Sequence, residues 1–225
     1  MNSNIKKAFD SLYQNLFETY GPQHWWPADS LLEMIVGAIL TQNTAWSNVA
    51  TAIQQLKSEN LLDFEILVKT DPEKIAPHIK CTGYFNVKSK RLHTFLNWWW
   101  ARTNGNLENL FLTPTEKLRM DLLDQEGIGP ETADSILLYG GQKLVFVVDA
   151  YTKRIFKRHG LITGNETYED IRIFAEKYLP PSVEIYKELH ALIVKAGAEK
   201  CKTQPNCQDC PLEFWRSSYI ADNLY

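Results

Sequence analysis

Long apolar runs are missing from this chain of 225 residues. No stretch reaches the roughly 20 apolar residues that a membrane-spanning helix needs, and the N-terminal segment MNSNIKKAFD lacks the apolar core of a signal peptide. Cysteine is also scarce, and four cysteines at uneven spacing do not form the framework of a disulfide-stabilised secreted domain. These absences argue against the membrane and secreted classes, and we expect a cytoplasmic protein.

A surplus of positive charge is missing too. With 24 Lys and Arg against 27 Asp and Glu, the net charge is −3, whereas proteins that bind polyanions without sequence preference usually carry a basic surface. Solvated helix faces often contain local charge clusters, so the two basic clusters present here have more than one interpretation. The first contains Lys88, Lys90 and Arg91, and the second contains Lys143, Lys153, Arg154, Lys157 and Arg158 around the single acid Asp149.

What the chain does contain is helical periodicity. Apolar residues recur at three- and four-residue spacing in most segments, beginning with Ile5, Phe9, Leu12 and Leu16. The one run rich in β-branched residues, LVFVV at 144–148, is short and isolated. With 44% hydrophobic residues and seven Trp, the chain can bury a real core in one large or two small domains. The pattern predicts an all-α fold.

The most informative segment is 122–158, where two helical patterns flank the tight turn Gly127-Ile128-Gly129. The sequence Thr113-Pro114-Thr115-Glu116 predicts the start of the first helix, with a capping-box spacing and a proline at its first position, and Pro130 begins the second. Glycine allows torsions that a Cβ would penalise, and it lets a phosphate come close. The free N–H groups and positive dipole end of the second helix would then form an anion site.

A short apolar run after this turn ends in Asp149, which a basic helix follows. The position directly before a helix lets backbone N–H groups orient the carboxylate. Each feature also has an ordinary structural interpretation, as a helical hairpin in a core and as an acid that only caps a helix. Together, however, a backbone grip on phosphate and one carboxylate at a fixed distance along the chain are what removal of a base from DNA requires.

Several stretches between about Trp25 and Cys210 carry a family resemblance: GAILTQNTAW, TGYFNVKSKR, GIGPETAD, FVVDAYTKR and a C-terminal cysteine cluster. They resemble the endonuclease III superfamily of DNA glycosylases, in which a helix-hairpin-helix motif precedes an aspartate. The resemblance implies two helical lobes with a central cleft, a six-helix lobe of residues 29–143 and a second lobe of residues 1–28 and 144–225. It also implies that Asp149 is catalytic and that a monomer binds double-stranded DNA with a flipped damaged base, in association with the nucleoid.

One position departs from the pattern of the strand-cleaving members of this superfamily. These enzymes carry a nucleophilic lysine two residues after the second glycine of the hairpin, where this chain has Glu131. Because a carboxylate cannot form a Schiff base, the AP-lyase step should be absent. The hairpin and the basic helix supply the expected DNA-binding residues, which are Gly127, Ile128, Gly129, Thr132, Lys153 and Arg154.

The WWP and LTQNT sequences are similar to those of the type III 3-methyladenine DNA glycosylases. By that resemblance Trp25 and Trp46 sandwich the flipped base, although the family has Phe at the second position. Two indoles would attract a positively charged methylated purine by stacking and cation–π contact, but core packing explains such residues equally well. The superfamily also implies that Gln42 fills the gap left by the base and that Tyr84 wedges the duplex.

The cysteines Cys201, Cys207 and Cys210 resemble the iron–sulfur loop of the superfamily. Their first gap contains five residues where the family pattern has six, and Arg216 stands where a fourth cysteine is expected. A [4Fe–4S] cluster normally takes four thiolates, and the remaining thiol, Cys81, falls in the other lobe by resemblance. Three thiolates could hold an atypical or incomplete cluster or a zinc ion, or the loop is kept only for packing. No cofactor is expected to be required for catalysis.

The combined pattern predicts a monofunctional DNA N-glycosylase of base excision repair that excises alkylated purines such as 3-methyladenine. The glycosidic bond of a methylated base is already weak, so one carboxylate that stabilises charge or activates water would suffice. Two alternatives stay open: an endonuclease III-like glycosylase for oxidised or mismatched bases, and a non-enzymatic helix-hairpin-helix module that binds DNA. The module is disfavoured because it needs neither Asp149 nor a pair of indoles.

Overall fold

The computed structural model describes residues 2–215, and within these it contains helices and loops but no β-strand. The predicted all-α fold is confirmed. The chain divides into two units, which we call the central unit, Trp26–Lys143, and the terminal unit, Met1–Trp25 together with Leu144–Tyr225. None of the described helices is long and apolar enough to cross a membrane.

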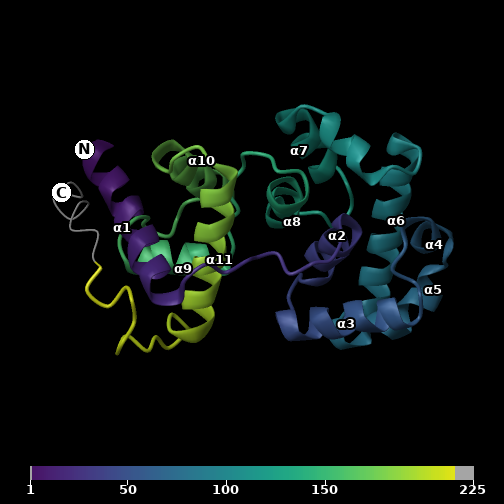
Figure 1. Ribbon diagram of the computed structural model, residues 1–225, viewed down its shortest axis with the longest axis horizontal. Coiled ribbons are helices and arrows are strands. Elements are labelled where there is room, and N and C mark those ends of the chain that lie inside the picture. The colour runs from purple at the N-terminus through teal and green to yellow at the C-terminus, as the bar shows by residue number, and fades with distance from the viewer. Residues whose placement is uncertain (1, 216–225) are drawn as a thin grey trace. The chain divides into compact units, whose positions relative to one another are not determined.

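In the terminal unit, the N-terminal helix α1 (Asn2–Tyr20) packs against helices from the other end of the chain (Figure 1). Phe9 is fully buried, and its ring lies 5.6 Å from that of Phe156. Leu12 and Leu16, which lie on the same predicted apolar stripe, are fully buried as well. The partner helices are α9 (Ala150–Arg158), α10 (Tyr168–Tyr178) and α11 (Val183–Glu199).

The core of the central unit forms around the long helix α6 (Phe85–Thr103). Trp99 of this helix is fully buried, and its ring meets that of Phe111 edge to face at 5.5 Å. The helices that pack on α6 are α2 (Leu31–Leu40), α4 (Phe64–Lys69), α5 (Pro72–Ile75) and the 3₁₀ helices η1 (Ala76–Thr82) and η2 (Leu107–Leu112) (Figure 1). The unit also contains α3 (Trp46–Ser58), α7 (Thr115–Leu123) and α8 (Pro130–Ser135), which continues into the π-helical turn η3 (Ile136–Gly140).

The starts of α2 and α7 are capped in different ways. Ser30 caps α2 by accepting the Glu33 N–H at 3.2 Å, but the Glu33 carboxylate accepts from the N–H before Ser30, so the capping box is half formed. The prediction for Thr113 is wrong. This residue closes η2, and α7 begins at Thr115 with Pro114 at the N-cap position and no side-chain cap.

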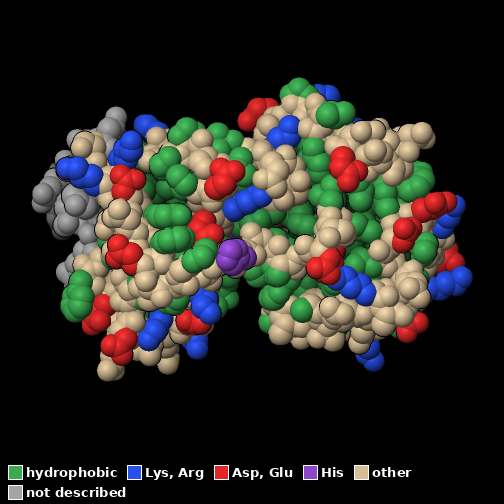
Figure 2. All heavy atoms as spheres, viewed as in Figure 1, with side chains coloured by type: hydrophobic (Ala, Val, Ile, Leu, Met, Phe, Trp, Pro, Cys, Tyr) green, Lys and Arg blue, Asp and Glu red, His purple; other side chains and the backbone are tan. Residues whose placement is uncertain are grey.

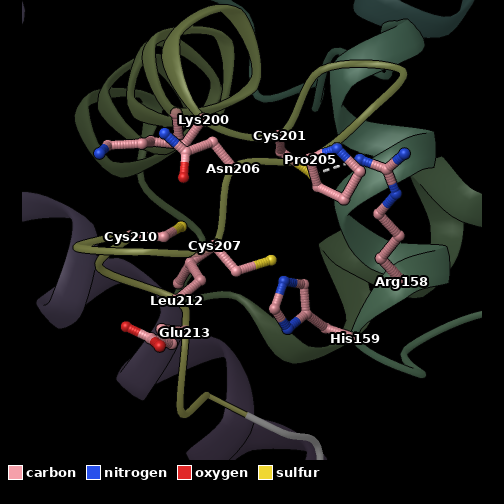
Figure 3. Close-up of a pocket in the computed structure, with 11 residues that line it drawn as sticks. Arg158, His159, Lys200, Cys201, Pro205, Asn206, Cys207, Cys210, Leu212 and Glu213 are labelled. Carbon is pink, nitrogen blue, oxygen red and sulfur yellow. Dashed lines mark hydrogen bonds between the residues drawn. The ribbon is translucent and has the colours of Figure 1, made fainter.

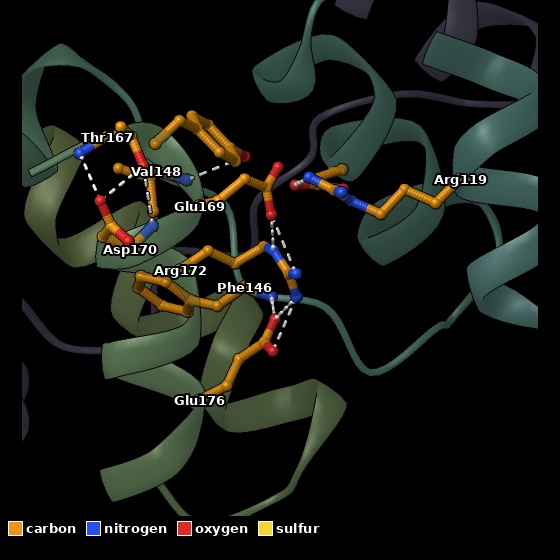
Figure 4. A network of polar contacts seen from close by, with 10 residues as sticks. Arg119, Phe146, Val148, Thr167, Glu169, Asp170, Arg172 and Glu176 are labelled. Carbon is orange, nitrogen blue, oxygen red and sulfur yellow. Dashed lines mark hydrogen bonds and ion pairs between the residues drawn. The ribbon is translucent and has the colours of Figure 1, made fainter. Parts of the chain in front are cut away.

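The apolar run at 145–148 forms a buried loop instead of a strand, and side chains of α10 hold it in place (Figure 4). The Phe146 N–H donates to the Glu176 carboxylate at 2.9 Å, and the Val148 N–H donates to the Tyr168 hydroxyl at 3.3 Å. Buried backbone donors need such partners. These two bonds fix the run directly before the start of α9.

Arg172 in turn positions Glu176, the acid that binds the apolar run at 145–148. The arginine is 8% exposed, and it donates to both carboxylate oxygens of Glu176 at 2.9 and 2.8 Å (Figure 4). Its other side donates to Glu169 at 3.0 Å. Hydrogen bonds between charged groups are stronger than neutral ones, so Arg172 holds Glu176 where it can accept the Phe146 N–H before α9.

Candidate active site

The turn between α7 and α8 has glycine at its two ends for different reasons. Gly127 has φ +79°, and a Cβ there would lie 2.4 Å from Cδ of Arg91. Gly129 has φ −87° and ψ 174°, which any residue can adopt, and a Cβ there would meet nothing within 4 Å. The Gly129 backbone therefore borders open space at the N-terminus of α8, where helical N–H groups lack partners within the helix.

A buried ion pair joins the two helices of this hairpin. Arg119 of α7 donates to the two carboxylate oxygens of Asp134 on α8, at 2.7 and 3.0 Å, and Asp134 is fully buried. Removing one partner of such a pair would leave a buried charge without compensation. The pair therefore holds the two helices in one relative orientation. The sequence pattern gave no indication of it, since the partners come from different helices.

Gln42 anchors the loop after α2 to the hairpin. Its amide N–H groups donate to the Gly127 carbonyl at 2.9 Å and to the Thr132 hydroxyl at 3.1 Å. Thr132 and Ile128, both among the residues expected to bind DNA, are 7% and 5% exposed. Ile128 packs into the core and the Thr132 hydroxyl binds Gln42, so only backbone groups of the turn remain for a phosphate.

Asp149 lies at the N-cap of α9 in the terminal unit, as expected from its position before a helix. One carboxylate oxygen accepts the Thr152 N–H at 2.7 Å, and the residue is 8% exposed. The other oxygen, Oδ2, lies 3.9 Å from Nε2 of His190 on α11. The carboxylate is therefore held by a backbone donor on one side and faces an imidazole on the other.

Sequence reasoning missed His190. The signal that could have identified it is its place on the apolar stripe of α11, one helical turn from the buried residues Tyr186 and Ile193. Burial lowers the pKa of His190, and the Asp149 carboxylate raises that pKa by less. A neutral imidazole therefore lies beside the Asp149 carboxylate at neutral pH.

We expect the folded protein to lose stability as the pH falls from about 7.5 to about 5.5. The unfolded chain takes up a proton on His190 near the ordinary histidine pKa of 6.5, whereas burial keeps this pKa lower in the folded state. Urea unfolding at each pH should show a shallower loss for His190→Gln. His159, whose pKa burial also lowers, would retain part of the loss. His24→Asn, which changes an exposed histidine, is the control, and an equal slope in all three proteins would contradict this expectation.

Tyr84 occupies the turn that leads into α6. The residue is 77% exposed and adopts a left-handed conformation with φ +47°. Such a φ is uncommon for a large side chain, and it persists only where the surrounding structure enforces it. The turn thus presents an aromatic ring to solvent from a restrained backbone, which suits the wedge expected at this position.

The two tryptophans expected to bind a base belong to different units. Trp46 in the central unit is half-buried, and its ring meets that of Trp26 edge to face at 5.3 Å. Trp26 also packs against the Tyr139 ring at 5.4 Å. Trp25 is the last residue of the first segment of the terminal unit and is half-buried. Trp46 therefore combines packing with partial exposure.

Arg154 and Lys88, from the two basic clusters, do not contribute to an open basic surface. Arg154 was expected to contact DNA, but its guanidinium donates to the Cys201 carbonyl at 2.5 Å and lies 4.9 Å from the Tyr151 ring, because the loop after α11 reaches back over α9. Lys88 is only 4% exposed. Lys153, by contrast, is exposed. On the face shown in Figure 2, basic and acidic side chains alternate within each unit without a continuous basic patch.

The three C-terminal cysteines line one cavity of about 120 Å³ together with His159 (Figure 3). Cys201 is buried and its sulfur accepts from Arg158 at 3.2 Å, whereas Cys207 is exposed. Among the described residues, no three Cys, His, Asp or Glu side chains converge as ligands of a metal ion. The described thiols therefore do not fit a four-ligand cluster, and Arg216 lies outside the described residues.

Comparison with known sequences places these features in a family. Residues 36–181 match the model of the HhH-GPD superfamily of base excision DNA repair proteins. A protein of Methanocaldococcus jannaschii, provisionally named as a DNA repair glycosylase, is 43% identical over 215 residues, which are 95% of this chain and 97% of the relative. Endonuclease III of Sulfolobus acidocaldarius is 26% identical over 192 residues, covering 84% of this chain and 82% of that enzyme.

Solved structures of DNA glycosylases resemble this chain as well. The Helicobacter pylori 3-methyladenine DNA glycosylase MagIII, bound to 1,N6-ethenoadenine, gives a TM-score of 0.73 at 29% identity, covering 88% of this chain and 97% of that one. Endonuclease III in a non-covalent DNA complex gives a TM-score of 0.78 at 18% identity, covering 96% of this chain and 95% of that one. At this lower identity, the second match speaks only for the fold.

Proposed function

The chain belongs to the HhH-GPD superfamily of base excision DNA repair proteins, which makes it a DNA glycosylase, and we propose that it is a monofunctional enzyme for alkylated purines such as 3-methyladenine. The observation that carries the proposal is the environment of Asp149. Its carboxylate is buried, accepts a helix N-terminal N–H, and faces the imidazole of His190. Such a carboxylate is oriented before the substrate arrives, which is what electrostatic catalysis needs.

In the proposed reaction, Asp149 acts on the sugar of the everted nucleotide. The bond between C1′ and the base nitrogen breaks, and its electron pair leaves with the base, which departs neutral if it carried a methyl group and a positive charge. The Asp149 carboxylate stabilises the positive charge that develops on the sugar and accepts a proton from the water that attacks C1′. General-base catalysis contributes roughly 10²–10⁴-fold in rate, and one group that stabilises charge electrostatically contributes roughly 10²–10³-fold.

A cationic purine suits the aromatic residues that we assign to the base pocket, Trp25 and Trp46. An indole face attracts a cation by about 2 kcal/mol when water is excluded, and a neutral, undamaged base would lack this term. The similarity to MagIII supports a purine substrate. The similarity to endonuclease III supports the alternative, a glycosylase for oxidised or mismatched bases, because that relative covers most of the chain. We further propose that the protein acts as a monomer on double-stranded DNA in the cytoplasm.

The absence of lyase activity follows from Glu131, which is exposed in the first turn of α8 at the position of the lyase lysine. We expect the wild type to release a base and leave an intact abasic strand. Borohydride added during the reaction should trap no covalent protein–DNA complex, because Glu131 has no amine with which to form a Schiff base. A known bifunctional endonuclease III treated in parallel is the positive control, and efficient trapping of this protein would overturn the monofunctional assignment.

Base excision from a matched panel of duplexes tests the proposal. Each duplex carries one methylated purine, one oxidised pyrimidine, one mismatch or no lesion in the same sequence. Faster excision of the methylated purine than of the others is the expected result. Faster excision of the oxidised or mismatched base would favour the endonuclease III-like alternative. Binding to all duplexes without excision from any of them would favour a DNA-binding module.

A further inference from the structure

Lys88 is buried with its ammonium group on two helix ends. The residue is 4% exposed, and Nζ donates at 2.8 Å to the Leu40 carbonyl and at 2.8 Å to the Thr82 carbonyl. Leu40 is the last residue of α2, and Thr82 is the last residue of η1. The terminal carbonyls of a helix lack partners within it and carry partial negative charge. One ammonium group therefore satisfies the ends of two separate helices.

Each of these two carbonyls lies just before a loop that carries a residue expected to enter the duplex when a base is everted. Gln42 follows Leu40 by two positions, and Tyr84 follows Thr82 by two positions. The first loop is also bound to the hairpin through the Gln42 amide. Tyr84 keeps its left-handed φ of +47° directly at the N-cap of α6, the helix that carries Lys88. Lys88 therefore connects the starts of both loops, and it lies one helical turn from Tyr84.

We propose that Lys88 is a positioning residue that fixes the spacing between the loops of Gln42 and Tyr84. Both side chains then enter the duplex together when a base is everted, and the Gln42 amide exchanges its bonds to Gly127 and Thr132 for bonds to DNA. This inference rests on the proposed glycosylase function and on the gap and wedge roles of the two residues. Leaving a buried carbonyl without a hydrogen bond costs free energy. The Lys88 ammonium group therefore holds the start of each loop in place. Without that charge, the two loops would move independently, and eversion would no longer be supported from both sides.

The inference predicts a defect that depends on how tightly the target base is paired. Eversion from an intact duplex costs a few kcal/mol, and it costs least when the base is already unpaired. A residue that supports eversion should therefore matter for a methylated purine opposite thymine. It should matter little for the same purine opposite an abasic-site analogue, where the pairing cost is gone. A residue that only stabilises the fold would affect both substrates equally.

The test compares Lys88→Met with the wild type and with Lys90→Met, a matched change at an exposed lysine on the same helix. In K88M, kcat on the paired substrate should fall roughly tenfold or more with little change in KM, and kcat on the unpaired substrate should fall less than threefold. Lys88→Gln, which retains N–H donors, should recover part of the activity on the paired substrate. Thermal unfolding of each variant establishes that it is folded.

Equal losses on the two substrates, or wild-type kinetics on both, would overturn the role assigned to Lys88. Failure of the proposed function looks different, because the wild type and K90M would then also excise nothing. In that case, the fluorescence of a 2-aminopurine placed in the duplex still reports eversion. An increase on binding the wild type that is absent with K88M would support the inference, and equal increases would overturn it.

Discussion

Asparagine in place of Asp149 should remove most base excision while the protein stays folded and continues to bind DNA. Asparagine caps helices about as well as aspartate, so its amide oxygen should still accept the Thr152 N–H. What disappears is the negative charge that stabilises the sugar cation and accepts the proton of water. We expect a loss on the order of 10³-fold, measured as the single-turnover excision rate, with DNA affinity followed by fluorescence anisotropy.

Asp63 offers a matched control for this change. Its side chain caps α4 in the same way, accepting the Ile66 N–H at 2.9 Å, but it is exposed in the central unit. Asp63→Asn removes a charge from a helix cap and should leave excision unchanged. Excision by D149N at the wild-type rate would show that another group performs the chemistry.

Alanine in place of Gly129 should weaken DNA binding in a protein that remains folded. The backbone torsions at this position suit alanine, and the added methyl group would contact no protein atom within 4 Å. The methyl group would, however, occupy the space through which a phosphate approaches the N–H groups at the start of α8. A hydrogen bond to a charged group is worth about 1.5–3 kcal/mol, so we expect affinity to fall roughly 10- to 100-fold. Anisotropy titrations with an undamaged duplex at one fixed salt concentration measure this.

Gly127→Ala should behave in the opposite way, because the strain there lies within the protein. Its φ of +79° is unfavourable for alanine by about 1–2 kcal/mol, and the methyl group would collide with the Arg91 side chain. This variant should unfold at a lower temperature than G129A. If G129A binds DNA as tightly as the wild type, then phosphate does not approach the hairpin at this point.

The sequence by itself determined the features that depend on neighbours along the chain. Helical periodicity gave the all-α fold, Pro130 gave the start of α8, and Asp149 gave the N-cap of α9. These features are local, since a cap or a helix face is decided within about four residues. The family could be identified for a related reason, because its motifs are short, contiguous stretches. Thr113 shows the limit of local reasoning, because this residue caps the C-terminus of the preceding 3₁₀ helix η2 and does not start α7.

Only the tertiary structure decided what the charged and polar side chains do. Lys88 belongs to a basic cluster in the sequence, yet its ammonium group binds the terminal carbonyls of two helices. Arg154 binds the carbonyl of Cys201, in a loop that is distant along the chain. The partner of Asp149 on α11, His190, lies far along the chain. Charge in a sequence does not reveal whether a side chain faces water or a buried carbonyl, because the carbonyls and acids that decide this belong to elements brought together only by folding.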